Sequence, residues 1–335
     1  MQFGIIGSGS WGTALAKILT DNNHTINWWI RNTSTINHIK QRRHNPHYLH
    51  TAFFNNSLLQ MSSSSQFVIE NSEVILIAVP SAYVKNALDN LPVNCFDQKK
   101  IVSAIKGILP DNNELLNDYL KKNFYVDLEN YFTVLGPCHA EEVAAEKLSY
   151  LTFSGLDEET ANKIAAHFHS EYINTLVSHD VIGVQYAAIL KNIYALGAGI
   201  AHGLQYGDNF LSVYIANSAN EMVRFLRKAV VYKNAQEYDE INYAASVYLG
   251  DLLVTCYSLY SRNRTFGNMI GKGYSVKAAQ LELNMVAEGY NASKCIYKLN
   301  KKVNAEMPIA AIIYKILWEH LDAEEEFKKI ESLLI

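Results

Sequence analysis

The first thirty residues carry the feature that most constrains the fold. A short apolar run, Phe3–Ile6, leads directly into Gly7, Gly9 and Gly12, and an Ala- and Leu-rich segment follows. In a strand–turn–helix unit, these glycines allow a tight turn, a close approach of the backbone to a pyrophosphate, and close packing of helix on strand. A second apolar run, Thr25–Ile30, completes the pattern. We therefore expect a dinucleotide-binding unit with the pyrophosphate at the helix N-terminus; the alternative is an ordinary strand-to-helix turn.

The end of the second predicted strand bears on which dinucleotide binds. Sites for NAD usually place a carboxylate roughly 20 residues beyond the glycines, whereas a nearby arginine accommodates the 2′-phosphate of NADP. Here Arg31 and Asn32 occupy this place, and no carboxylate does. NADP(H) is therefore the preferred cofactor and NAD(H) is possible. The alternative is that Arg31 points into solvent and both cofactors are used equally well.

Length and charge limit the remaining possibilities. A chain of 335 residues is expected to form two domains, because single cores usually stop growing near about 250–300 residues. An apolar fraction of 49% is ample for packed cores, and a net charge of -4 is only weakly acidic. Nucleic acid and anionic membrane surfaces are therefore not expected partners.

Cysteine spacing and hydropathy exclude further classes. The four cysteines form no C-x-x-C pair, so neither a disulfide framework nor a metal site is expected; they are Cys95, Cys138, Cys256 and Cys295. The N-terminus enters the first predicted strand without a signal segment. An uninterrupted apolar run of about 18 residues, which a membrane span needs, is not found either. These observations predict a cytoplasmic enzyme.

Further apolar runs predict an α/β fold with a doubly wound, mostly parallel sheet. Continuous apolarity is typical of central parallel strands that are covered on both faces. Such runs are Glu73–Val79, Lys100–Ile105, Tyr131–Leu135, Tyr150–Ser154 and Ile173–Val177. The polar stretch between Arg31 and Ser65 is interpreted as a helix and loop with a solvated basic patch, and its serines 62–65 as a turn.

Candidate ligand-binding residues follow two of these strands. In doubly wound sheets, ligands bind beyond the carboxyl ends of the strands. Lys106, Gly136 and Cys138 fall at such ends. Lys106 follows a buried strand and precedes a glycine, which favours a role in binding; the alternative is a solvent-exposed loop lysine.

From residue 181 onward, strand-like runs give way to helical periodicity. We therefore expect a Rossmann-type domain over residues 1–180 and an all-helical substrate and catalytic domain over 181–335. Val181–Gly199 is almost wholly apolar, yet it contains Lys191 on a face of small side chains. Burying a lone charge is costly and favours the neutral amine, which suits a group that exchanges protons. The alternative is a structural lysine whose stem lies along apolar surface.

A second polar cluster begins at Asp251. If Asp251 opens a helix, then Thr255, Ser258 and Arg262 share its face at helical spacing. The segment Ser261–Arg264 then brings together two guanidiniums, a hydroxyl and an amide, a composition suited to binding phosphate. The alternative is a helix C-terminus at which cations are favoured by the dipole.

Several motifs, in this order, carry a resemblance to a known family. They are GSGSWGTALA from Gly7, Lys106-Gly107, G-P-x-x-A-E-E from Gly136, Lys191-Asn192, Gly207-Asp208-Asn209, G-D-L at Gly250, S-R-N-R at Ser261 and A-E-G at Ala287. Over essentially its full length the chain resembles bacterial NAD(P)-dependent glycerol-3-phosphate dehydrogenase. The resemblance implies reduction of dihydroxyacetone phosphate to sn-glycerol 3-phosphate for glycerophospholipid synthesis, and commonly a homodimer.

The resemblance also implies roles for individual residues. By resemblance, Lys191 is the acid–base group. In the mechanism that we expect from the residues and the resemblance together, Asp251 holds Lys191, and Lys106 adds positive charge near the substrate oxygen. The expected substrate-binding residues are Lys106, Gly136, Cys138, Lys191, Asp251, Ser261, Arg262 and Asn263. The expected cofactor contacts beyond Gly7, Gly9 and Gly12 are Ser10, Trp11, Arg31, Lys106, Ala140, Arg262, Val286 and Glu288.

Two positions depart from the family pattern. Cys138 stands where the family usually has serine, which replaces a hydroxyl donor with a weaker S–H donor, and His202 stands where aspartate is expected. Two other functions remain as alternatives. One is a related β-hydroxyacid or ketoacid reductase, and the other is a non-catalytic NADP(H)-sensing module.

Overall fold

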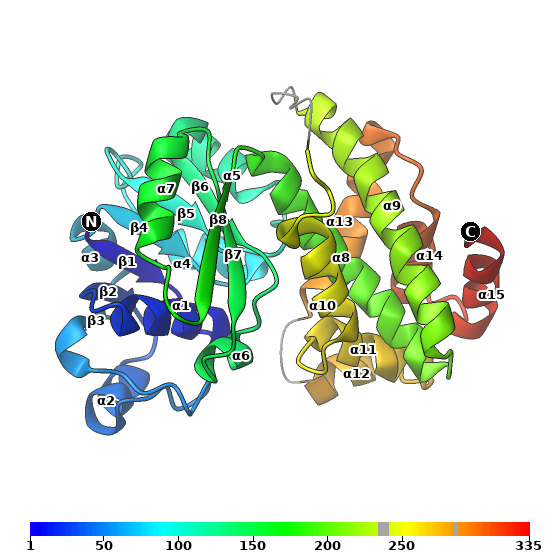
Figure 1. The fold of residues 1–335 in the computed structure, drawn as a ribbon, viewed down its shortest axis with the longest axis horizontal. Helices are drawn as coiled ribbons and strands as arrows, with labels where there is room; N and C mark the ends of the chain where they lie inside the picture. The colour runs from blue at the N-terminus through cyan, green and yellow to red at the C-terminus, as the bar shows by residue number, and fades with distance from the viewer. Residues whose placement is uncertain (234–240, 284–286) are drawn as a thin grey trace. The chain divides into compact units, whose positions relative to one another are not determined.

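The computed structural model describes residues 1–233, 241–283 and 287–335. The chain divides into two compact units. The first comprises Met1–Ile105 and Glu114–Val181, and the second comprises Lys106–Asn113 and Ile182–Ile335 (Figure 1). The short segment Lys106–Asn113 therefore belongs with the helical half of the chain although it follows a strand of the sheet.

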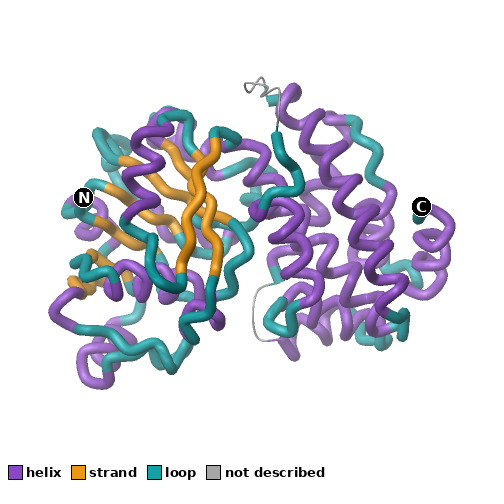
Figure 2. Tube along the Cα trace, in the orientation of Figure 1, coloured by secondary structure: helices purple, strands orange, loops and turns teal. Residues whose placement is uncertain are grey.

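The first unit is built on an eight-stranded sheet with the order β3-β2-β1-β4-β5-β6-β7-β8. Its strands are orange in Figure 2. Neighbouring strands are parallel except for β6 and β7, which are antiparallel. The expected doubly wound, mostly parallel sheet is thus confirmed. The strands are β1 (Phe3–Ile6), β2 (Ile26–Trp29), β3 (Leu59–Ser62), β4 (Val74–Ile77), β5 (Lys100–Ser103), β6 (Tyr131–Leu135), β7 (Ser149–Ser154) and β8 (Ile173–Ser178).

The helices of the first unit connect these strands and cover the sheet. Every residue of β1, β4 and β6 is buried, which accounts for the continuous apolar runs, because strands covered on both faces have no solvent-facing side. Among the helices, α7 packs on β7 and β8, and α1 packs against α6. They are α1 (Ser10–Asp21), α2 (Thr33–Arg42), α3 (Ser65–Glu70), α4 (Val84–Leu88), α5 (Leu116–Phe124), α6 (Ala140–Ala144) and α7 (Glu158–Ala166), with short 3₁₀ turns at η1 (Asn56–Leu58), η2 (Ser81–Tyr83) and η3 (Leu128–Asn130).

The stretch between β2 and β4 differs from the sequence-based interpretation. It contains a helix and loop as expected, but it also contains β3 at the edge of the sheet. Within β3 only Leu59 is fully buried, so the strand carries no apolar run. The serines that follow do not simply form a turn, because Ser62 ends β3 and Ser64 caps α3 by accepting a hydrogen bond from the N–H of Phe67.

The second unit consists of helices and loops in its described part (Figure 2). Its central helix, α8, is buried along residues 181–201, as expected for a helix that is apolar on all sides. Among the described residues, α8 alone is long and apolar enough to cross a membrane, and its apolar stretch is wholly buried inside the protein. The helices are α8 (Val181–Gly203), α9 (Asp208–Tyr232), η4 (Ser246–Gly250, a π-helix), α10 (Asp251–Tyr257), α11 (Arg262–Gly271), α12 (Val276–Leu283), α13 (Glu288–Val303), α14 (Pro308–Trp318) and α15 (Ala323–Leu333).

Candidate active site

The glycine-rich turn between β1 and α1 has three glycines with three different structural reasons. Gly7 has a φ of 125°, which side chains of L-residues rarely adopt. A Cβ on Gly12 would lie 2.3 Å from the carbonyl oxygen of Gly7, so only glycine lets α1 pack this closely. A Cβ on Gly9 would meet no atom within 4 Å. The turn is therefore packed at Gly7 and Gly12 and open at Gly9, as the dinucleotide fingerprint requires.

Two side chains from elsewhere in the first unit hold this turn. The indole N–H of the buried Trp28 donates to the carbonyl oxygen of Gly7 at 2.8 Å. The amide of Asn45, which is completely buried, donates to the carbonyl oxygen of Ser8 at 3.0 Å and to the hydroxyl of Thr13 at 2.9 Å. Sequence reasoning missed Asn45, because it follows a basic patch that resembles a solvated surface. Both contacts fix the turn without occupying the open side at Gly9.

The other expected cofactor residues of the first unit lie at the ends of strands and helices. Ser10 and Trp11 form the first turn of α1, where backbone N–H groups and the helix dipole favour an anion. Arg31 is exposed between the end of β2 and the start of α2. Ala140 is the first residue of α6 and is buried. The expected contact at Val286 lies outside the described residues.

Two expected substrate residues follow β6 in the first unit. Gly136 has a φ of 134°, and a Cβ there would lie 2.7 Å from the carbonyl oxygen of Tyr150. The glycine is therefore needed for the turn itself, whatever it binds. Cys138, two residues later, is buried with 3% of its surface exposed.

The densest polar arrangement of the second unit is centred on Lys191. This residue lies in the middle of α8, and its ammonium donates a short hydrogen bond to the Oδ1 atom of Asp251 at the start of α10. The two side chains are only 4% and 1% exposed. The other carboxylate oxygen of Asp251 is buried and makes no hydrogen bond within the described part of the chain. An ammonium and a carboxylate are thus buried together in an otherwise apolar helix pair, which is costly unless they are paired.

The predicted continuous polar face from Asp251 to Arg262 is wrong. Asp251 and Thr255 are buried on one side of α10, while Tyr257 is exposed. The helix ends at Tyr257, because Ser258 is extended (φ -65°, ψ 136°). Arg262 instead begins a separate helix, α11, so it does not continue the stripe.

A chain of amide hydrogen bonds connects several expected site residues. Asn263 donates through Nδ2 to the Oδ1 atom of Asn192 at 2.9 Å, and its own Oδ1 accepts from the N–H of Gly289 at 2.9 Å. Asn192 in turn donates to the carbonyl oxygen of Lys106 at 2.8 Å. These hydrogen bonds hold together the backbone of Lys106, Asn192 beside Lys191, and Gly289 beside Glu288. Asn192 was missed as a site residue, although its place beside Lys191 in an apolar run was a usable signal.

The start of α11 provides the features of an anion site. Ser261 is the N-cap, and its hydroxyl accepts from the N–H of Arg264 at 3.3 Å. Arg262 and Asn263 are the first two residues of this ten-residue helix. Their N–H groups, the helix dipole and the guanidinium of Arg262 all favour a negatively charged group. Ser261–Arg264 therefore lies at a helix N-terminus, and the alternative of a helix C-terminus at this segment is wrong.

The Cys256 thiol close to Lys191 is unsuited to nucleophilic work. Burial raises the pKa of the Cys256 thiol on α10 to about 12, even though the charges of Lys191 and Arg264 lower it. This thiol therefore stays protonated near neutral pH. His202 lies exposed near the end of α8, where its Nδ1 is 3.1 Å from the Oδ1 atom of Asn268.

Comparisons with known proteins agree on one family. The model for the N-terminus of NAD-dependent glycerol-3-phosphate dehydrogenase matches residues 2–161, and the model for its C-terminus matches residues 180–328. A glycerol-3-phosphate dehydrogenase (NAD(P)+) of Macrococcus caseolyticus is 31% identical over 331 residues, which cover 98% of this chain and 97% of the relative. The corresponding protein of Bacillus cytotoxicus is 33% identical over 322 residues, covering 94% and 90%. The crystal structure of glycerol-3-phosphate dehydrogenase from Coxiella burnetii matches with a TM-score of 0.87 at 25% identity and covers 98% of both chains. The chain therefore belongs to the NAD-dependent glycerol-3-phosphate dehydrogenase family.

Proposed function

We propose that this protein reduces dihydroxyacetone phosphate to sn-glycerol 3-phosphate with NAD(P)H and so supplies the backbone of glycerophospholipids. The observation that carries the proposal is the buried Lys191–Asp251 pair in the middle of an apolar helix. Such a pair is costly for stability, and family membership supports a catalytic reason for it. The alternative of a related ketoacid reductase is not favoured, and neither is a non-catalytic sensor.

The residues of the first unit fit a dinucleotide. The open side of Gly9 leaves room for a pyrophosphate, and the first-turn N–H groups of α1 at Ser10 and Trp11 would hold it. The exposed Arg31 would accept the 2′-phosphate of NADPH, so we expect NADPH to be preferred over NADH. We further assign cofactor contacts to Ala140 and, in the second unit, to Glu288. When bound, the nicotinamide supplies the hydride for the reaction.

Lys191 would donate the proton that the reduced ketone needs. As the carbonyl carbon gains hydride, negative charge develops on its oxygen, and a positioned ammonium stabilises this charge and then transfers a proton to it. Asp251 keeps Lys191 oriented through their hydrogen bond and stabilises the ammonium before the transfer. Lys106 would add positive charge near the same oxygen. Afterwards Lys191 is a neutral amine that regains a proton from solvent.

The phosphate end of the substrate would bind at the start of α11. Ser261 caps this helix, and Arg262 and Asn263 present N–H groups and a guanidinium there. Asn263 is held by its hydrogen bonds to Asn192 and Gly289, so its position is fixed before substrate binds. Gly136 and Cys138 complete the proposed substrate contacts. With a weaker donor at Cys138 than serine, we expect the backbone there to matter more than the side chain.

Initial rates of NADPH oxidation test the function directly. We expect rapid oxidation with dihydroxyacetone phosphate and very slow oxidation with unphosphorylated dihydroxyacetone. Lys191→Ala should abolish turnover while NADPH binding persists, whereas Lys298→Ala, at an exposed lysine on α13, serves as the matched control. No oxidation with either ketone, despite NADPH binding, would exclude this substrate.

Cofactor preference, assembly and location need separate measurements. Arg31→Ala should lower kcat/KM for NADPH more than for NADH, since only NADPH carries the 2′-phosphate. We also propose a homodimer and a cytoplasmic location, both supported by the family resemblance. Light scattering after size-exclusion chromatography measures the subunit number, and fractionation of cells measures the location.

A further inference from the structure

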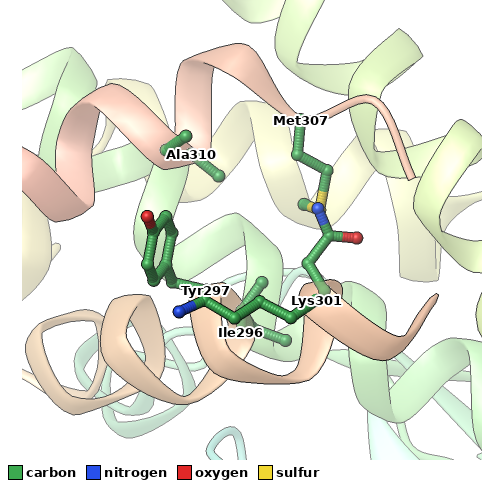
Figure 3. A pocket seen from close by; sticks show the side chains of 7 residues that line it. Ile296, Tyr297, Lys301, Met307 and Ala310 are labelled. Carbon is green, nitrogen blue, oxygen red and sulfur yellow. The ribbon is translucent and has the colours of Figure 1, made fainter. Parts of the chain in front are cut away.

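The second unit contains a pocket that lies apart from the Lys191 cluster. It has a volume of about 160 Å³ and opens between α13 and α14 (Figure 3). None of its lining residues belongs to the catalytic, substrate or cofactor positions described above. Its occupancy is therefore a property separate from the reductase activity.

The inner part of this pocket is apolar. It is lined by Ile296 on α13, Met307 at the N-cap of α14 and Ala310 on α14, with 1%, 6% and 6% of their surfaces exposed. Figure 3 shows the Met307 side chain extending from the α14 side toward α13. Apolar cavities of about 150 Å³ hold a molecule as large as benzene. The pocket is therefore large enough for an apolar group of about six carbon atoms.

One end of the pocket carries a positive charge on an aromatic wall. The ring of Tyr297 stacks on Tyr314 with centroids 3.8 Å apart and an angle of 4° between the planes. The ammonium of Lys301 lies 5.3 Å from the centre of the Tyr297 ring. Because the stack leaves no room on the Tyr314 side, the ammonium lies over the other face. Lys301 is exposed near the end of α13, so its ammonium can approach an anion.

The shape of the pocket is fixed by hydrogen bonds on its rim. The side chain of Asn300 donates to the carbonyl oxygen of Ala305 and accepts from its N–H, both at 2.9 Å. The N–H groups of Ile309 and Ala310 at the start of α14 already donate to the buried carboxylate of Glu221. An anion in the pocket would therefore be held by Lys301 and not by the helix N-terminus. A preformed pocket loses less entropy when a ligand binds.

We propose that this pocket binds a small amphiphilic anion, specifically a carboxylate with an unbranched tail of about five carbon atoms. The tail fills the space beside Ile296 and Met307, and the carboxylate pairs with Lys301 over the Tyr297 ring. A tail of five methylene-sized groups gives a dissociation constant on the order of 1 mM. The charge pair, at an exposed lysine, strengthens binding about threefold over an uncharged head group.

Methyl NMR of Met307 tests the proposal, with hexanoate as the probe. The chain has six methionines, and Met307→Leu identifies the signal of the one that lines the pocket. With protein labelled at the methionine methyls, hexanoate should shift the Met307 signal saturably. Hexan-1-ol, which has the same tail without the charge, should bind about threefold more weakly.

Three variants make the test specific. Lys301→Met should weaken hexanoate binding about threefold, whereas Lys302→Met, at a neighbouring exposed lysine outside the pocket, should leave it unchanged. Ala311→Phe, at a partly exposed lining position, should fill the pocket and abolish the shift. The proposal is overturned if wild-type protein shows no saturable shift or if hexan-1-ol binds equally well. Equal losses in the two lysine variants, or full binding by Ala311→Phe, also overturn it.

Discussion

Replacing Asp251 by Asn tests whether Lys191 is held as a buried charge. Asparagine has nearly the same shape, and its carbonyl oxygen can still accept the hydrogen bond from the Lys191 ammonium. The substitution removes the negative charge, however, from a site in which both side chains are almost completely buried. It also places an N–H₂ group at the buried Oδ2 position, where the carboxylate oxygen makes no hydrogen bond to the described residues.

The size of the effect follows from these two losses. Removing one partner of a buried ion pair typically costs about 3–5 kcal/mol, because the other charge stays buried without compensation. The hydrogen bond that asparagine keeps places Asp251→Asn at the lower end, at about 3 kcal/mol. The double variant Lys191→Met/Asp251→Leu removes both charges and should recover most of this loss, since apolar replacements of buried pairs are often neutral.

Stability and activity must be measured separately in these variants. Hydrogen exchange of the amides in α8 and α10 reports the stability of the second unit alone, which global unfolding of a two-unit chain does not. Turnover should fall at least about a hundredfold in Asp251→Asn and be abolished in the double variant, although the double variant is the more stable. A loss of stability below about 1 kcal/mol in Asp251→Asn would refute the buried charge pair. A double variant no more stable than Asp251→Asn would refute it as well.

Three further predictions concern the glycine turn, the buried Glu221, and the partly buried His24 and His167. Gly12→Ala should destabilise the first unit, because the new Cβ would lie 2.3 Å from a backbone oxygen. Gly9→Ala should keep the melting temperature of the protein but lose NADPH affinity in a fluorescence titration. Unchanged NADPH affinity in Gly9→Ala would contradict the pyrophosphate site. Burial raises the pKa of Glu221 from 4.5 to about 7, so its stabilising contribution is complete below pH 4.5 and is lost as the pH rises through 7. Relative to Glu221→Gln, the second unit of the wild type should lose about 3 kcal/mol of stability between pH 4.5 and 8, measured by hydrogen exchange of the α9 amides, and parallel profiles would count against this. Burial lowers the pKa values of His24 and His167, whose ring nitrogens are 3.2 Å apart. Their contribution to the stability of the first unit is therefore present above pH 6.5 and lost as the pH falls. Replacing both by Gln should make the stability of the first unit depend less on pH below 6.5.

Local patterns made the Rossmann half of the fold predictable. The glycine turn is recognisable because the positive φ of Gly7 and the contact of Gly12 with the carbonyl oxygen of Gly7 both arise within the turn itself. The central strands are recognisable because burial on both faces requires continuous apolarity. The edge strand β3 lacked this signal, since one of its faces is open to solvent. Asn45 was not predictable either, because its role arises from a contact with Ser8, 37 residues away along the chain.

The helical half was predictable in outline but not at its breaks. Lys191 is recognisable in the sequence because burying a charge within an apolar run is costly unless the charge has a function. Asp251 is recognisable because it is the first residue of the next polar cluster. The break at Ser258 gave no such signal, since the residues from Asp251 to Arg262 keep helical spacing throughout. In the structure, the Ser258 hydroxyl accepts a hydrogen bond from the N–H of Tyr260 at 3.1 Å, and Ser261 starts a new helix. Serines favour such local hydrogen bonds over helix continuation, but the spacing of the serines does not reveal at which of them the helix ends.

The membership of Lys106–Asn113 in the second unit has a consequence for how this chain can be divided. The polypeptide passes from one unit to the other after Ile105, after Asn113 and after Val181, so no single cut separates the two. A fragment that begins at Ile182 would lack the carbonyl group to which Asn192 donates. The helical half would then be incomplete, because its amide network would lack one hydrogen-bond acceptor. Any attempt to graft it onto another cofactor-binding domain must carry these eight residues along, inserted as a loop from the host sheet.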